Sequence, residues 1–180
     1  LENFASRSLH DMAVVGKAVT AQYYGRPANY SYWSGCSTGG RQGMMEAQRY
    51  PDDYDGINAM APAINWDRWV PAVLWPQVVM HQERNFPTQC ELSAFTQAAI
   101  AACDDNDGVT DGVVDLPKSC DYNPYRLVGT KVLCEGKEIT ISRSDAAVVR
   151  KIWDGTPLWY GLNKSTPLGA HAMTVPGPDG

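Results

Sequence analysis

A short apolar segment that runs directly into a glycine-bracketed serine constrains this chain more than any other feature. The run Tyr30-Ser31-Tyr32-Trp33 favours a strand, and the residues from Gln42 to Arg49 have the composition of a helix. Between them lies the pattern Gly35-x-Ser37-x-Gly39. Because a serine on a sharp turn from strand to helix sits in strained backbone, only small neighbours let the two elements pass closely. The pattern therefore predicts a nucleophile elbow with the Ser37 hydroxyl projecting outward.

A serine presented in this way is a candidate catalytic nucleophile. Its oxygen would lie near the N-terminus of the following helix, whose unpaired amides stabilise a developing oxyanion, with the Thr38 N–H as the first donor. The alternative is a glycine-rich turn that happens to contain a serine, since short patterns recur by chance. The strand before the turn and the helix after it favour the nucleophile.

Three stretches of the chain resemble the tannase/feruloyl esterase family of secreted carboxylic ester hydrolases. They are Gly35-Cys36-Ser37-Thr38-Gly39-Gly40-Arg41-Gln42-Gly43, Tyr54-Asp55-Gly56-Ile57 with the later Ala61-Pro62-Ala63, and the acidic run from Ala102 to Val113. The resemblance implies an α/β fold, namely a partial α/β-hydrolase core with its parallel sheet plus part of an inserted calcium-binding lid. It also implies serine esterase activity on aromatic esters such as gallates or ferulates.

The chain divides into an N-terminal part of strands and helices and a C-terminal part of different style. A strand over residues 55–60 would complete one strand-helix-strand crossover with the elbow. Two parallel strands do not make a stable sheet, so we expect a truncated or internal piece of a larger enzyme. Tryptophans and prolines become frequent after residue 62, which predicts a core over residues 1–62 and a lid over residues 63–180.

Helical spacing predicts further elements in both parts. A helix over residues 8–24 should pack on a sheet through Met12, Val15, Ala18, Val19 and Tyr23, with His10 in a capping or packing role. Helices are also expected over residues 92–102 and 144–152, the second with Asp145 in its first turn. Residues 153–180 are rich in glycine and proline and predict irregular structure.

Charge and composition exclude several classes of partner. The net charge is −5, no basic stripe is present and no apolar run reaches the length of a membrane span, so neither nucleic acid nor a membrane is expected.

Leu1-Glu2-Asn3-Phe4 lacks the features of a secretory signal. Five cysteines and the sequons at Asn29 and Asn163 nevertheless favour an oxidising compartment, hence a secreted glycoprotein. The alternative is a set of buried thiols.

Aspartates crowd one glycine-punctuated loop, among them Asp104, Asp107, Asp111 and Asp115. Hard oxygen ligands in a short loop suit Ca²⁺, although the spacing does not fit an EF-hand. By resemblance to the family's lid site, the ligands would be the side chains of Asp104, Asp107 and Asp111 and the carbonyls of Val109 and Val113. Asp115 would lie outside the direct ligands, and the alternative is a pair of solvated Asp-Gly turns.

The resemblance also implies a disulfide pattern. Cys103 and Cys120 would close the acidic loop, Cys90 and Cys134 would form an outer bridge, and Cys36 would bond a cysteine outside this chain. Five cysteines with one left over allow many pairings, so sequence alone does not choose among them. A bridge across the acidic loop contributes roughly 3 kcal/mol in the chain-entropy model.

An activated serine needs a histidine base and an acid that orients it, both expected after Ser37 in this fold. In the resembled family the base is followed by the cysteine that bonds the one beside the serine, but His81 precedes Gln82 and His171 precedes Ala172. The catalytic histidine and acid are therefore expected outside this chain, and the second oxyanion donor before Leu1. His81 and His171 are expected to be lid residues, and the chain alone should be inactive.

Five tryptophans offer flat apolar surface for a phenolic ring, although core packing is the commoner fate of tryptophan. They are Trp66, Trp69, Trp75, Trp153 and Trp159. The expected partners are thus a small or polysaccharide-linked phenolic ester and the remainder of the same enzyme. The competing hypothesis is a secreted Ca²⁺-binding interaction module with a vestigial elbow.

Overall fold

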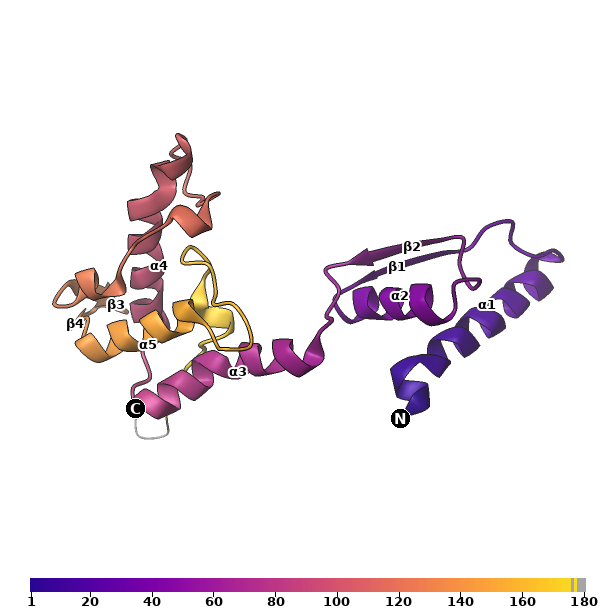
Figure 1. Ribbon diagram of the computed structural model, residues 1–180, viewed down its shortest axis with the longest axis horizontal. Helices are drawn as coiled ribbons and strands as arrows, with labels where there is room; N and C mark the ends of the chain where they lie inside the picture. Colours follow the sequence, from indigo (N-terminus) through magenta and orange to yellow (C-terminus); the bar gives the residue numbers. More distant parts are fainter. Residues whose placement is uncertain (176, 178–180) are drawn as a thin grey trace. The chain divides into compact units, whose positions relative to one another are not determined.

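The computed structural model describes residues 1–175 and 177 and divides the chain into two compact units (Figure 1). The first unit runs from Leu1 to Trp66, and the second begins at Asp67. The sequence places the boundary four residues earlier, after Pro62. Each unit has its own internal packing and is described by itself.

The first unit contains one strand-helix-strand motif. Its elements are the π-helical turn η1 (Asn3–Arg7), helix α1 (Ser8–Tyr24), strand β1 (Tyr32–Cys36), helix α2 (Thr38–Arg49) and strand β2 (Gly56–Met60). The strands pair in parallel, from Tyr32 opposite Gly56 to Cys36 opposite Met60. Figure 1 shows α2 alongside both strands, against which it packs. The predicted crossover is therefore present, with a parallel sheet of two strands.

Helix α1 has the predicted bounds but not the predicted packing. The side chains of Met12, Val15, Val19 and Tyr23 are exposed, whereas Leu9 and Ala13 are buried. The helix packs against η1 and α2. Because these side chains are exposed, the expectation that they pack on a sheet is wrong for the described residues.

The second unit is mainly helical and has its own hydrophobic core. Its elements are α3 (Trp66–Glu83), which starts one residue before the unit boundary, α4 (Gln89–Cys103), η2 (Asp104–Asp107), η3 (Pro117–Ser119), η4 (Pro124–Leu127), β3 (Lys131–Cys134), β4 (Lys137–Thr140), α5 (Arg143–Asp154) and η5 (Leu168–Ala170). Phe95 of α4 and Val148, Val149 and Ile152 of α5 are among the fully buried core residues. The disulfides Cys90–Cys134 and Cys103–Cys120 are both present, as the resemblance implied.

Helices α4 and α5 have strong local start signals. Thr88 with Glu91 and Ser142 with Asp145 form reciprocal capping boxes, in which each side chain bonds the other residue's backbone N–H. Both helices are present as predicted, α4 starting three residues and α5 one residue before the predicted ranges. None of the helices in the described part of the chain combines the length and apolarity that a membrane span needs.

Two elements of the second unit were not expected from the sequence. Helix α3 continues through Pro71 and Pro76, in the stretch of tryptophans and prolines for which no helix was predicted. Strands β3 and β4 form an antiparallel hairpin whose turn, Glu135-Gly136, has positive φ angles of 49° and 81° at its two residues. The signal for the hairpin was the alternation in residues 131–140 around Glu-Gly, a weaker turn pair than Asn-Gly or Asp-Gly.

Candidate active site

Ser37 lies alone between the end of β1 and the start of α2. Its φ and ψ angles are 60° and −111°, a conformation that residues with a side chain rarely adopt. The residue is exposed, and its hydroxyl forms no hydrogen bond with a described residue. A strained serine with an outward hydroxyl is the geometry that the sequence pattern predicted.

Three backbone hydrogen bonds hold Ser37 in this conformation. Its N–H donates to the carbonyl oxygen of Met60 at 3.1 Å, which extends the pairing with β2 by one residue. Its own carbonyl accepts from Arg41 N–H at 3.0 Å in α2 and from Ala63 N–H at 3.1 Å. Since both backbone groups of Ser37 are bonded, the surrounding fold opposes relaxation of the strained angles.

The glycines in and beside the pattern differ in the space that a Cβ would find. A Cβ at Gly35 would lie 2.6 Å from the carbonyl carbon and oxygen of Gly39, so the strand and helix touch there through their backbones. A Cβ at Gly40 would collide with the Met60 carbonyl of β2, whereas a Cβ at Gly39 would meet nothing within 4 Å. The close approach thus demands glycine at residues 35 and 40, and position 39 supplies the backbone that they approach.

Thr38 is the first residue of α2, so its N–H lacks an acceptor within the helix. This amide and the positive end of the helix dipole lie beside the Ser37 residue. Cys36, the last residue of β1, is an exposed free thiol. Ser37, Thr38 and Cys36 therefore form one contiguous corner at the β1–α2 junction.

The three histidines have surroundings of their own. His10 places Nδ1 2.7 Å from Asp53 Oδ2 and stacks on Tyr50, which agrees with a packing role. His81 contacts Phe86 edge to face, and His171 lines a pocket of the second unit. Among the described residues, no histidine or carboxylate forms a hydrogen bond with Ser37.

Helix α2 also carries a buried carboxyl group that sequence reasoning missed. Glu46 is fully buried, and neither of its carboxyl oxygens has a hydrogen-bond partner among the described residues. Burial, followed by the negative charge of nearby Asp53, raises the pKa of Glu46, while the charge of His10 opposes the shift. The sequence signal was its spacing, since Gly40, Gly43 and Glu46 follow one buried helix face at intervals of three residues.

The acidic loop is ordered by its own carboxylates. Asp104 Oδ1 accepts hydrogen bonds from the N–H groups of Asp111 at 3.2 Å and Gly112 at 2.9 Å. Asp107 Oδ1 accepts from Val109 N–H, and Asp111 Oδ1 accepts from Val113 N–H. The Cys103–Cys120 disulfide closes the loop. In the described part of the chain, however, no three His, Cys, Asp or Glu side chains gather into a group that could hold a metal.

The tryptophans have different environments. Trp69, Trp75 and Trp159 line a pocket in the second unit, but Trp153 belongs to the hydrophobic core and contacts Tyr122. The expectation that Trp153 offers surface to a ligand is therefore wrong. Trp66 belongs to the first unit, where its ring lies against the Arg41 guanidinium and its Nε1 donates to the Ala63 carbonyl.

Known proteins resemble this chain along most of its length. A probable feruloyl esterase of Arthroderma benhamiae is 61% identical over 172 residues, which cover 94% of this chain and 32% of that protein. Its fold also resembles that of solved structures. The tannin acyl hydrolase from Aspergillus niger has a TM-score of 0.79 at 28% identity, and the feruloyl esterase B from Aspergillus oryzae has a TM-score of 0.71 at 29% identity.

The chain spans about a third of these relatives, namely 32% of the first protein and 33% and 35% of the two solved chains. In each of the two structural comparisons the matched part covers 93% of this chain. Residues 1–169 match the family described as tannase and feruloyl esterase. The chain therefore belongs to the tannase and feruloyl esterase family.

Proposed function

We propose that this chain carries the nucleophile of a carboxylic ester hydrolase with an α/β-hydrolase core and an inserted lid. The observation that carries the proposal is Ser37, an exposed serine with a φ of 60° at a strand-helix junction. Three backbone hydrogen bonds fix that geometry. Backbone strain of this kind is typical of functional sites, where the surrounding structure maintains it.

In the proposed reaction, Ser37 Oγ bonds to the ester carbonyl carbon while its proton passes to a histidine base. The carbonyl electron pair moves to oxygen, and the Thr38 N–H donates a hydrogen bond to that oxyanion. When the intermediate collapses, the bond to the alcohol breaks and the alcohol takes the proton from the histidine. Water then attacks the acyl-enzyme by the same sequence and releases the acid and the free serine.

The base, the acid and the second oxyanion donor are proposed to come from other parts of the same enzyme. Two facts support this: no described histidine bonds Ser37, and the chain spans about a third of its relatives. Cys36 is free and exposed beside the nucleophile, which suits a bridge to a cysteine that follows the catalytic histidine. On this proposal the 180-residue chain alone is inactive.

The proposed substrates are esters of aromatic acids, either small or linked to polysaccharide. The support is the names of the similar proteins, a feruloyl esterase and a tannin acyl hydrolase. Secretion is proposed as well. The two disulfides support it, as do the exposed sequon residues Asn29 and Asn163.

A structural Ca²⁺ ion is proposed for the acidic loop. The donor set fits a hard cation, with three carboxylates from Asp104, Asp107 and Asp111 and the carbonyls of Val109 and Val113. One oxygen of each carboxylate accepts backbone N–H groups, and these bonds orient the side chains along a single loop. Ion binding requires the three carboxylates to draw together, and the ion would supply the positive charge that offsets their repulsion.

A fluorophosphonate probe on the full-length enzyme tests the nucleophile. We expect labelling at Ser37, loss of the label in Ser37→Ala, and full labelling in Ser34→Ala, which removes an exposed hydroxyl from the same strand. Absence of labelling at Ser37 in the wild-type enzyme would favour the interaction module with a vestigial elbow.

Thermal melting with and without a chelator tests the ion separately. Calcium should raise the melting temperature of the wild type and of Asp105→Asn, a matched control in the same loop, but not that of Asp111→Asn. An unchanged melting temperature in the wild type would count against the calcium site and leave the nucleophile unaffected.

A further inference from the structure

Trp33 links strand β1 to the first turn of α2, the helix that follows Ser37. Its indole Nε1–H donates a hydrogen bond to the carbonyl oxygen of Gly39 at 3.0 Å. Gly35 lies two residues further along β1 and therefore on the same face of the strand. A Cβ at Gly35 would meet that same Gly39 carbonyl group at 2.6 Å. Two residues of β1 thus contact one carbonyl in the first turn of α2, Trp33 through a hydrogen bond and Gly35 through close packing.

The indole ring of Trp33 is itself confined. A Cβ at Gly43 would lie 2.8 Å from the Cδ1 and Nε1 atoms of the ring, so the ring lies against the backbone of α2 about one turn beyond Gly39. Tyr54 contacts the ring edge to face, with 5.7 Å between the two ring centroids. A ring in contact with both a helix backbone and a second aromatic side chain has few alternative rotamers. The direction of the indole N–H is therefore set by packing.

The first turn of α2 has little support of its own. Gly39, Gly40 and Gly43 are three of its first six residues, and glycine is the least favourable helix residue after proline. Ser37 precedes the helix, but its side chain makes no capping hydrogen bond to the first amides. This turn nevertheless presents the Thr38 N–H, the proposed oxyanion donor. A hydrogen bond from outside the helix to the Gly39 carbonyl therefore restrains a turn that its own residues leave weak.

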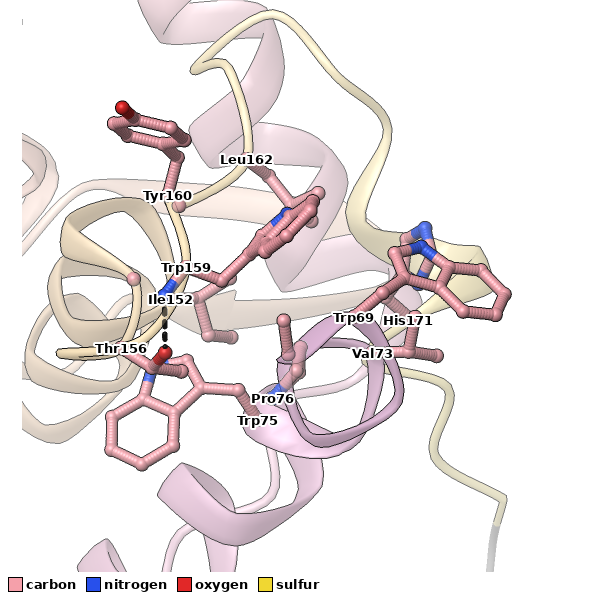
Figure 2. A pocket seen from close by; sticks show the side chains of 13 residues that line it. Trp69, Val73, Trp75, Pro76, Ile152, Thr156, Trp159, Tyr160, Leu162 and His171 are labelled. Atoms are coloured by element: carbon pink, nitrogen blue, oxygen red, sulfur yellow. Dashed lines mark hydrogen bonds between the residues drawn. The ribbon is translucent and has the colours of Figure 1, made fainter. Parts of the chain in front are cut away.

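An indole N–H that bonds a carbonyl of another element restrains the two elements relative to each other. In the second unit, Trp75 of α3, shown in Figure 2, donates to the Lys151 carbonyl of α5, also at 3.0 Å. The Trp33 bond joins β1 to α2 in the same way, but its acceptor lies only two residues after Ser37. The Trp33 bond therefore acts on the orientation of the nucleophile and of the amide beside it.

We propose that Trp33 is a positioning residue for ester hydrolysis, whose N–H fixes the first turn of α2 so that Ser37 and the Thr38 amide keep their relative orientation. The inference rests on the proposed function, because it concerns the same nucleophile. In this role Trp33 acts through the Gly39 carbonyl and not on the reacting atoms. An oxyanion donor stabilises the transition state only within hydrogen-bond distance of the developing charge. A displaced Thr38 N–H therefore lowers kcat and leaves substrate binding largely unchanged.

Kinetics of the full-length enzyme with methyl ferulate test this role. Trp33 is replaced by benzothienylalanine, which keeps the fused ring but carries sulfur in place of the N–H. The change should lower kcat about fivefold, the factor that corresponds to one lost hydrogen bond, and should change KM less than about twofold. Titration of Ser37 with the fluorophosphonate counts the intact active sites, so kcat refers to folded enzyme only. A loss of fold alone would lower the number of sites and leave kcat per site unchanged.

Two natural substitutions accompany this replacement. Trp33→Phe removes the N–H and part of the ring, and it should lower kcat per site at least as much. Tyr32→Phe is the matched control, because Tyr32 is exposed and its side chain lies on the opposite face of β1. It should keep the kcat and KM of the wild type. The rate constant for labelling of Ser37, which depends on the same oxyanion donors but not on the ester, should fall in parallel with kcat.

Wild-type kcat per site and labelling rate in the benzothienylalanine protein would overturn the proposal, and so would a higher KM at unchanged kcat. A wild-type enzyme that neither hydrolyses the ester nor is labelled at Ser37 would overturn the proposed function and this inference with it. An active wild type with an unaffected Trp33 variant overturns this inference alone, so the two failures are distinguishable.

Discussion

The contact between Gly35 and Gly39 makes a sharp prediction about the junction that carries Ser37. A Cβ added at Gly35 would lie 2.6 Å from two backbone atoms of Gly39, roughly 1 Å inside ordinary van der Waals contact. Backbone atoms of α2 cannot rotate away as a side chain would. The strand and the helix must therefore separate, and overpacking of this kind costs about 1–3 kcal/mol.

Hydrogen–deuterium exchange of the β1 and α2 amides is the suitable assay, because it reports local opening in one unit without requiring two-state unfolding of the whole chain. Gly35→Ala should speed exchange of these amides by about 5-fold to about 150-fold. Gly39→Ala is the matched control. It places the same methyl group where nothing lies within 4 Å, inside a helix that favours alanine over glycine by about 1 kcal/mol.

Gly39→Ala should therefore leave exchange unchanged or slow it. Equal acceleration in both variants would refute the reasoning, because it would mean that the direct approach of β1 to α2 does not set the stability of the junction. Exchange in the second unit, which contains neither residue, should be unaffected in both variants.

Three further predictions concern other parts of the chain. The pKa of Glu46 is raised in the folded protein, so the folded state holds a proton that the unfolded state releases, and stability falls as pH rises from about 4.5 through the raised pKa. Hydrogen–deuterium exchange of the α2 amides measures this loss of stability, which Glu46→Gln should remove at neutral pH. If exchange protection has the same pH dependence in the wild type and in the variant, the reasoning is contradicted. Cys103→Ser should destabilise the second unit by about 3 kcal/mol, seen as faster proteolysis between residues 104 and 119, whereas cleavage at the rate of the wild type would show that the disulfide does not restrain the loop. Ser142→Ala removes one half of the α5 capping box and should cost about 1 kcal/mol in thermal melting, with Ser144→Ala as a control in the first turn of the same helix.

The sequence predicted the elements whose signals are local. The range 8–24 is reproduced by α1, which is followed by Gly25 with a positive φ of 66°. Helix-favouring composition predicted α4 and α5 to within a few residues, and the structure adds the capping residues, whose side chains satisfy free N–H groups at the start of each helix. The elbow was predictable for the same reason, because glycine, serine and the flanking propensities lie within one short segment.

Features that depend on distant residues were not predictable. No helix was predicted around Pro71 and Pro76, but α3 continues through both, and Pro76, Val79 and Met80 of this helix are buried. Here tertiary packing offsets the local cost of proline in a helix. The burial of Glu46 likewise depends on its tertiary surroundings, among them Asp53 and His10, which lie outside its own helix.

By itself the sequence determined the strained serine, its helix, the family and the residues of the acidic loop, because each is written in a few neighbouring positions. Tertiary structure alone decided which glycines are essential, which tryptophans are buried and which line a pocket. It also decided that Glu46 of α2 is buried. These outcomes depend on which atoms the fold brings within contact distance, and that information is distributed over the whole chain rather than held in any one segment.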